Sequence, residues 1–238
     1  MKDKAFNELI TKLSICEKCT NLKKKNNTDC SLINIYKEES LAKQVPSIWT
    51  DWYHRLDSSL MIIGQDWGPY EEMKKLHEAY LKNPTPEVWI QLIESEKSLT
   101  KKMLTKFLVE SAAYNKIVLD QEKINQIFIT NAIMCARKNN HYRGNDIDLK
   151  QSTLNCSEYL KRQIEIVHPK VIVTLGYYSL FALSKIFSFS ISKKLTEVIK
   201  ETPIIKVNDY TIIPAYHPSS QIKKEIQLEQ YKKIWENI

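Results

Sequence analysis

Three polar side chains of the kinds used in acid–base chemistry stand at the carboxyl ends of apolar segments. These side chains are Asp66, Asn131 and His217. A carboxylate can stabilise a positive charge or orient a water molecule, an amide can both donate and accept, and an imidazole can donate to a leaving group. Each residue alone also has a simpler interpretation, as a helix cap, a backbone contact or a buried hydrogen-bonded ring. Their occurrence at three segment ends favours a shared site.

Five cysteines offer a second kind of chemistry, which is metal or cluster binding. Cys16 and Cys19 form a C-x-x-C pair, and the others are Cys30, Cys135 and Cys156. An odd number of cysteines, behind an N-terminus without the apolar stretch of a signal peptide, argues against a disulfide framework and leads us to expect a cytoplasmic protein. The pair alone fits half a zinc site, half an iron–sulfur site, a redox pair or chance.

The composition indicates a folded protein with a basic surface. Of 238 residues, 43% are hydrophobic and 26% are charged, which suits a sizeable core and argues against global disorder. The 35 Lys and Arg residues exceed the 28 Asp and Glu residues, giving a net charge of +7. This charge has two explanations of about equal weight: a polyanionic partner such as nucleic acid, and a codon bias towards lysine. No apolar run approaches the roughly 20 residues that span a bilayer, so no membrane partner is expected.

The apolar segments alternate with helical patterns, which is typical of an α/β fold with a parallel sheet covered on both faces. Strands are expected at 59–64, 126–134, 171–176, 203–207 and 210–215, and helices at about 3–14, 71–82, 86–96, 98–113, 149–167, 177–187, 192–200 and from Ser219 onward. In such folds ligands bind at the carboxyl ends of the strands. The three polar residues therefore belong to the edge of the sheet where a ligand is expected.

The motifs around these residues resemble those of the uracil-DNA glycosylase superfamily. Residues 64–66 (G-Q-D) with Pro-Tyr at 69–70 resemble the G-Q-D-P-Y motif of the family-one enzymes, with two residues inserted, and they echo the G-E-x-P-G motif of the family-four enzymes. Residues 217–219 (H-P-S) resemble the second motif, and 128–135 is similar to the family-four strand that carries an Asn and then a cluster cysteine. The resemblance implies one domain over 1–238, a three-layer α/β/α sandwich with a central, mostly parallel four-stranded sheet.

The resemblance also implies a function. Such an enzyme flips uracil out of DNA and hydrolyses its N-glycosidic bond, leaving an abasic site, and it is usually a monomer. Asp66 would stabilise the sugar cation and orient the water, His217 would donate to O2 of the uracil anion, and Asn131 would bond the O4 and N3 edge. Further expected contacts are Gln65, Tyr70 and Ser219 with the substrate, and Ser220, Gln221, Arg137 and Arg143 with DNA. In this interpretation Tyr70 excludes the methyl group of thymine, and Ser219 with the N-terminus of the last helix holds a phosphate.

The order of the cysteines is similar to that of the [4Fe-4S] ligands of the family-four enzymes. This resemblance implies the ligand set Cys16, Cys19, Cys135 and Cys156, with Cys30 in reserve. The cluster would be structural and would pin the N-terminal segment to the 135–156 region. A zinc ion on the same four cysteines is the alternative.

Departures from the family pattern leave parts of the interpretation open. The P-F-V-G segment that supplies a stacking aromatic in family four is not found in this sequence. A helical insertion is expected at about 71–97 instead. Candidates for the stacking ring are Trp67, Tyr70, Trp89 and Phe107. Two other functions stay open: a weak or inactive DNA-binding accessory protein of the same fold with a metal cluster, and a metal-binding regulator built on the C-x-x-C pair. Release of free uracil from DNA distinguishes the enzyme from both.

Overall fold

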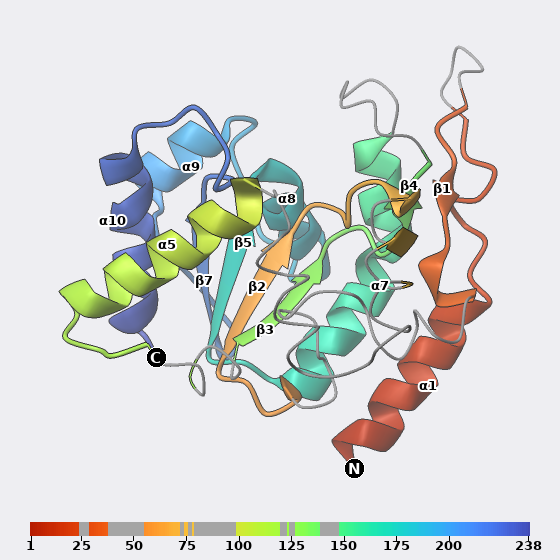
Figure 1. The fold of residues 1–238 in the computed structure, drawn as a ribbon, viewed down its shortest axis with the longest axis horizontal. Coiled ribbons are helices and arrows are strands. Elements are labelled where there is room, and N and C mark those ends of the chain that lie inside the picture. The colour runs from red at the N-terminus through yellow and green to blue at the C-terminus, as the bar shows by residue number, and fades with distance from the viewer. Residues whose placement is uncertain are drawn as a thin grey trace.

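A computed structural model describes residues 1–23, 29–37, 55–71, 74–75, 78, 99–119, 123, 127–138 and 148–238. Its centre is a five-stranded sheet in the order β3-β2-β5-β7-β6 (Figure 1). The strands are β2 (Leu60–Gly64), β3 (Ile127–Asn131), β5 (Val171–Leu175), β6 (Ile205–Val207) and β7 (Tyr210–Ala215). The predicted α/β class is confirmed, since β3, β2, β5 and β7 run parallel. The sheet has five strands where the family resemblance implies four. The fifth is β6, within the strand predicted at 203–207, which pairs antiparallel with β7 through a tight turn in which Asn208 has a φ of 49°.

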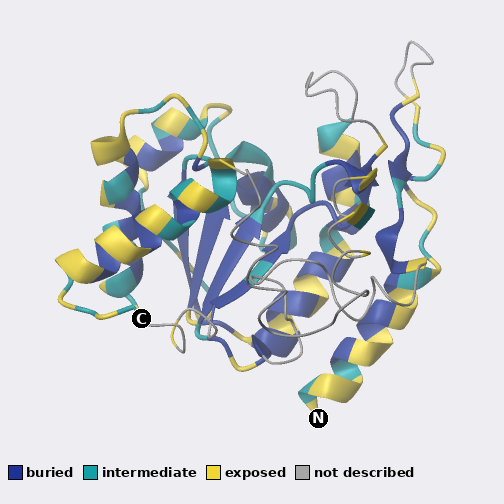
Figure 2. Ribbon diagram, viewed as in Figure 1, coloured by how far each residue is buried: buried dark blue, intermediate teal, exposed yellow. Residues whose placement is uncertain are grey.

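Helices cover both faces of this sheet. They are α1 (Lys2–Ser14), α5 (Leu99–Tyr114), α7 (Leu149–Val167), α8 (Tyr177–Ile186), α9 (Leu195–Glu201) and α10 (Lys224–Trp235). Alternate residues of β2 point to opposite faces, so Met61 and Ile63 pack with α1, α7, α8 and α9, whereas Leu60 and Ile62 pack with α5 and α10. The strands are buried between these layers (Figure 2). The three-layer arrangement therefore follows from strands that are apolar on both sides.

The last helix begins later than the sequence predicts. Helix α10 starts at Lys224, and the residues after His217 form a turn in which the Ser220 N–H donates to the His217 carbonyl oxygen at 2.8 Å. The expected helix from Ser219 onward was therefore wrong at its start. Ser219 lies in this turn and not at the N-terminus of the last helix. The predicted phosphate site at Ser219 therefore lacks the helix N-terminus.

A small antiparallel ribbon lies beside the main sheet, in two segments for which the sequence predicts no strand. It pairs β1 (Leu32–Ile33) with β4 (Ala136–Arg137), and the short 3-10 helix η1 (Ile35–Lys37) follows β1. The Leu32 N–H also donates to the carbonyl oxygen of Cys19 at 2.9 Å. The ribbon thus ties the segment after α1 to the segment after β3, and both segments carry cysteines.

Some predicted features lie outside the described residues. They include Arg143, Trp89 and almost all of the expected helical insertion at 71–97. Within the described part of the chain, none of the helices is both long and apolar enough to cross a membrane.

Candidate active site and cysteine cluster

The parallel pairing brings the three predicted polar residues to one edge of the sheet. Gly64 pairs with Asn131 at the carboxyl ends of β2 and β3, and Leu175 pairs with Ala215 at the carboxyl ends of β5 and β7. Asp66 follows Gly64 by two residues and His217 follows Ala215 by two. Their shared edge is the place where open α/β sheets bind ligands.

Asp66 is held by three hydrogen bonds from the first-motif loop and β4. Its Oδ1 accepts from the Gly68 N–H at 2.8 Å and from Nε of Arg137 at 3.0 Å, while its Oδ2 accepts from Nε2 of Gln65 at 2.8 Å. Gly68 has a φ of 84°, a backbone conformation that favours glycine and lets its N–H turn back to the carboxylate. The Asp66 side chain is only 4% exposed. A negative charge is thus fixed at the edge of the sheet.

Asn131 lies directly against Gly64. A Cβ atom at position 64 would collide with Oδ1 of Asn131, so the side chain occupies space that only a glycine leaves open. Asn131 is buried, yet among the described residues none hydrogen bonds its side-chain amide. A buried amide that none of these residues pairs is suited to bind a ligand.

The ring of His217 is oriented by Ser219. Its Nδ1 lies 2.9 Å from Oγ of Ser219 and accepts the Ser219 backbone N–H at 3.4 Å. Because a backbone N–H can only donate, the proton of the neutral ring belongs on Nε2. Burial lowers the pKa of His217, and the negative charge of Asp66 offsets part of this effect. The site therefore holds a neutral Nε2–H donor within electrostatic reach of a carboxylate.

The other predicted contacts occupy varied positions. Ser219 and Gln221 are exposed in the turn after His217, whereas the hydroxyl of Ser220 is buried and has no partner among the described residues. Tyr70, at the end of the first motif, is buried. Arg137, expected at the DNA backbone, instead directs its guanidinium to Asp66.

The described candidates for a stacking aromatic ring lie mostly in the core. Phe107 was wrong as a candidate, because it is buried between the sheet and α10 with its ring 5.1 Å from that of Tyr231. Trp67 packs against the core on the α1 side, beside Tyr36. Tyr70 belongs to the first motif and, like Trp67, packs on the α1 side of the sheet.

Two tyrosines at the same edge are not among the site residues that the sequence predicts. Tyr177 and Tyr178 follow Gly176 at the carboxyl end of β5, the strand between those that lead to Asp66 and His217. Both are partly exposed, and their ring centroids lie 5.6 Å apart. The signal was present, because the segment 171–176 ends in glycine as 59–64 does.

Comparison with known proteins decides the family. Residues 51–238 match the sequence pattern of the uracil DNA glycosylase superfamily. This chain belongs to that superfamily. The type-4 uracil-DNA glycosylase of Sulfurisphaera tokodaii is 35% identical over 143 residues, which cover 57% of this chain and 58% of the relative. That of Saccharolobus solfataricus is 30% identical over 116 residues, covering 46% and 51%.

A more distant relative belongs to another type. The type-5 uracil-DNA glycosylase of Pyrobaculum aerophilum is 26% identical over 100 residues, which cover 42% of this chain and 39% of the relative. The chain therefore spans about half the length of the curated relatives it matches. The predicted resemblance to the superfamily, and to its family-four branch, is confirmed by these matches.

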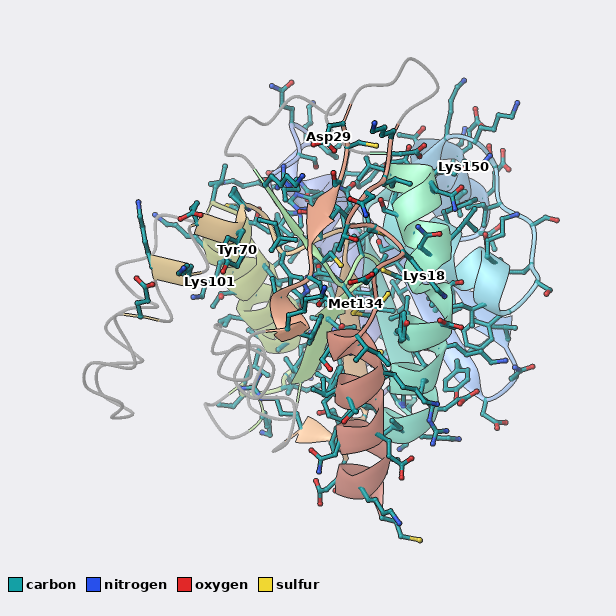
Figure 3. All side chains as sticks on the ribbon, turned by 90° about the vertical axis from the view of Figure 1, so that its right-hand side faces the viewer. Lys18, Asp29, Tyr70, Lys101, Met134 and Lys150 are labelled. Atoms are coloured by element: carbon teal, nitrogen blue, oxygen red, sulfur yellow. The ribbon has the colours of Figure 1, made fainter. Side chains whose placement is uncertain are left out.

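In this superfamily member, four cysteines from three segments gather on the α1 and α7 side. Cys16 and Cys19 follow α1, Cys135 precedes β4, and Cys156 lies on α7. A hydrogen bond between the Cys19 and Cys156 thiols lowers the pKa of Cys19 and raises that of Cys156. Figure 3 views this side, with Met134 above the end of α1 and Lys18 against α7. The Met134 N–H donates to Sγ of Cys156 at 3.4 Å.

The fifth cysteine points elsewhere. The Cys30 thiol donates to the carbonyl oxygen of Leu22 at 3.3 Å, whereas Cys16 is hydrogen bonded to Tyr159 on α7.

Burial raises the pKa of Cys135 to about 12, with Cys19 and Cys16 adding to the effect.

The donor set can be tested against a metal group. Four cysteine thiols are the donor type that a thiolate-bound cluster or zinc takes. Within the described ranges, no three side chains of His, Cys, Asp or Glu already converge as the ligands of a single metal ion.

Proposed function

We propose that this protein is a uracil-DNA glycosylase, which hydrolyses the bond between uracil and deoxyribose in DNA and leaves an abasic site. The observation that carries the proposal is the meeting of Asp66, Asn131 and His217 at one edge of the sheet, with the charge of Asp66 acting on His217. Membership of the superfamily and the names of the relatives support it. A DNA-binding accessory protein of the same fold is the alternative.

Hydrolysis of this bond creates an electron-poor sugar and a departing uracil anion. Asp66 would stabilise the sugar, and it would orient the water that adds its hydroxyl group to the anomeric carbon. His217 would donate its Nε2 hydrogen bond to O2 of the departing base, which needs a donor as negative charge develops there. The proton that the water loses passes to solvent, and the uracil anion takes a proton from solvent. In this proposal the negative group acts on the sugar side of the bond that breaks, and the hydrogen-bond donor acts on the base side.

Recognition of uracil would depend on Asn131. Its carbonyl oxygen accepts from N3–H and its amide donates to O4, whereas cytosine presents the reverse pattern at both atoms. Tyr70 would exclude the methyl group of thymine, and Gln65 would contact the substrate. The base must leave the duplex to reach these groups.

The DNA backbone would meet the turn after His217 and the basic chain beyond β4. Ser219, Ser220 and Gln221 belong to that turn, and Arg143 is the expected contact from the sequence. Arg137 leaves this set, because its guanidinium bonds Asp66.

We also propose that Cys16, Cys19, Cys135 and Cys156 hold a [4Fe-4S] cluster, which when bound would cross-link the segment after α1 to β4 and α7. Measured iron and sulfide content tests this. The Cys135→Ser variant is expected to lose iron, and Cys30→Ser, the matched control, is expected to keep it. Stoichiometric zinc in place of iron would contradict the cluster and favour the zinc alternative.

The experiment for the activity uses a labelled oligonucleotide with a single uracil, single- or double-stranded, followed by alkaline cleavage at abasic sites. The wild type is expected to cleave, and Asp66→Asn to be slower by about 10²- to 10⁴-fold. Asp57→Asn is the matched control, since Asp57 is an exposed carboxylate that pairs with Lys2 at 2.8 Å, away from the site. A folded wild type that releases no uracil from either substrate would favour the accessory protein.

A further inference from the structure

Arg137 belongs to the active site through a buried ion pair. Its Nε lies 3.0 Å from Oδ1 of Asp66, and the two side chains are 11% and 4% exposed. An arginine that reaches a DNA phosphate needs a solvent-facing guanidinium, and this one is covered. A long cationic side chain that is turned inward and bonds a buried carboxylate indicates a function that concerns that carboxylate.

The backbone of Arg137 is fixed from two directions. On one side its N–H donates to the Gly68 carbonyl oxygen at 2.9 Å, and it forms a parallel bridge with Pro69. On the other side it pairs with Leu32 of β1, whose N–H in turn bonds the carbonyl oxygen of Cys19 at 2.9 Å. The guanidinium therefore approaches Asp66 from a point that the first-motif loop and the β1–β4 ribbon both hold.

A count of acceptor sites shows what this contact does. A carboxylate has about four lone-pair positions, two on each oxygen. Among the described residues, Gly68 and Arg137 fill both positions on Oδ1, and Gln65 fills one on Oδ2. Counted over those residues alone, one position on Oδ2 stays available to a reacting water molecule.

We propose that Arg137 is a positioning residue of the glycosylase reaction: it holds Oδ1 of Asp66 so that Oδ2 presents its remaining acceptor position to the substrate. This inference rests on the proposed function. Its rival is the direct DNA contact that the sequence suggests. The two differ in what they change, because a phosphate contact contributes to DNA affinity and its salt dependence, and a positioning residue contributes to the rate of the bound complex.

The test compares Arg137→Met, Arg137→Lys and the wild type in single-turnover uracil release and in DNA binding at several salt concentrations. Arg162→Met is the matched control, since Arg162 forms an exposed pair with Glu165 on α7 at 3.2 Å. Arg137→Met is expected to lower the rate by about 10- to 100-fold, with DNA affinity changed by less than about twofold. Arg137→Lys keeps the charge but not the planar fork, and is expected to retain an intermediate rate.

A double-mutant comparison separates positioning from general structural damage. In the Asp66→Asn background, Arg137→Met is expected to lower the rate little further, because the carboxylate that it positions is gone. Should Arg137→Met not fold, Arg137→Lys makes the same comparison. An unchanged rate with weaker, less salt-dependent DNA binding would overturn the proposal in favour of the phosphate contact, and an equal loss in both backgrounds would overturn it in favour of structural damage. An inactive wild type would instead refute the proposed function, and the inference would fall with it.

Discussion

Replacing Gly64 with alanine tests the geometry of the base-recognition side of the site. Gly64 ends β2 and has no positive φ, so its backbone accepts alanine without strain. The added Cβ would collide with Oδ1 of Asn131, and its next neighbours are Cγ of Asn131 at 3.5 Å and the Thr130 carbonyl oxygen at 3.8 Å. The substitution therefore acts almost entirely by displacing the Asn131 side chain.

Two separate costs set the expected effects, the first on the stability of the protein and the second on its activity. Forcing an additional methyl group into a packed region typically destabilises a protein by about 1–3 kcal/mol. Removing the Asn131 amide from the base leaves polar groups of the base unpaired, which costs about 1–3 kcal/mol in the bound state. Since each 1.36 kcal/mol is a factor of ten, we expect kcat/KM for uracil release to fall between about fivefold and 150-fold.

The assay combines uracil release with urea denaturation, using Asn131→Ala as the second background. With Asn131 shortened, the Cβ added at position 64 would have space, and the stability cost of Gly64→Ala is expected to fall below about 1 kcal/mol. A Gly64→Ala protein with full activity would refute the reasoning. An equal loss of stability in the two backgrounds would refute it as well, because the cost would then not come from Asn131.

Three further predictions concern stability, each measured as the free energy of unfolding in urea. Because burial lowers the pKa of His217 below its ordinary value of 6.5, the unfolded chain binds more protons as the pH falls, so acidification from about pH 7 to 5 should destabilise the wild type more than His217→Gln. Lys2 donates to two backbone carbonyl oxygens at 2.8 and 3.1 Å, and Lys2→Met should cost about 1–2 kcal/mol. Thr130 Oγ1 donates to Oε1 of Gln163 at 2.7 Å in the core, so Thr130→Val and Gln163→Leu should each cost about 1–3 kcal/mol and the double variant less than their sum.

Clear results would contradict each of these. The same acid dependence in His217→Gln would mean that this ring does not couple protonation to folding. An unchanged unfolding transition in Lys2→Met would show that these backbone contacts add nothing net to the docking of α1. Strict additivity of the two core substitutions would separate Thr130 from Gln163 energetically.

The sequence predicts the main sheet well because buried parallel strands are continuous apolar runs. Residues 59–64 and 171–176 are such runs, and the helix after Asp148 was placed correctly from an apolar face that repeats from Leu149 to Val167. The same logic placed Asp66, Asn131 and His217 at strand ends. Long, regular elements carry enough repeated signal to be read without a structure.

Features set by a few tertiary contacts could not be predicted in this way. The β1–β4 ribbon has two residues in each strand, too few for any periodic pattern. Arg137 lies in a polar, basic stretch where charges are normally solvated, and only the folded chain shows it turned inward to Asp66. Phe107 has the spacing of a helix face, and that face packs onto Tyr231 in the core.

The central claim is that Asp66 and His217 act on one glycosidic bond, and a double-mutant cycle tests it most directly. Single-turnover release of uracil would be measured for the wild type, Asp66→Asn, His217→Asn and the protein with both changes. We expect activity in the wild type and losses of about 10²- to 10⁴-fold in each single variant. The double variant should keep much more activity than it would if the two losses multiplied. No uracil release by the folded wild type, or full activity in either single variant, would contradict the account.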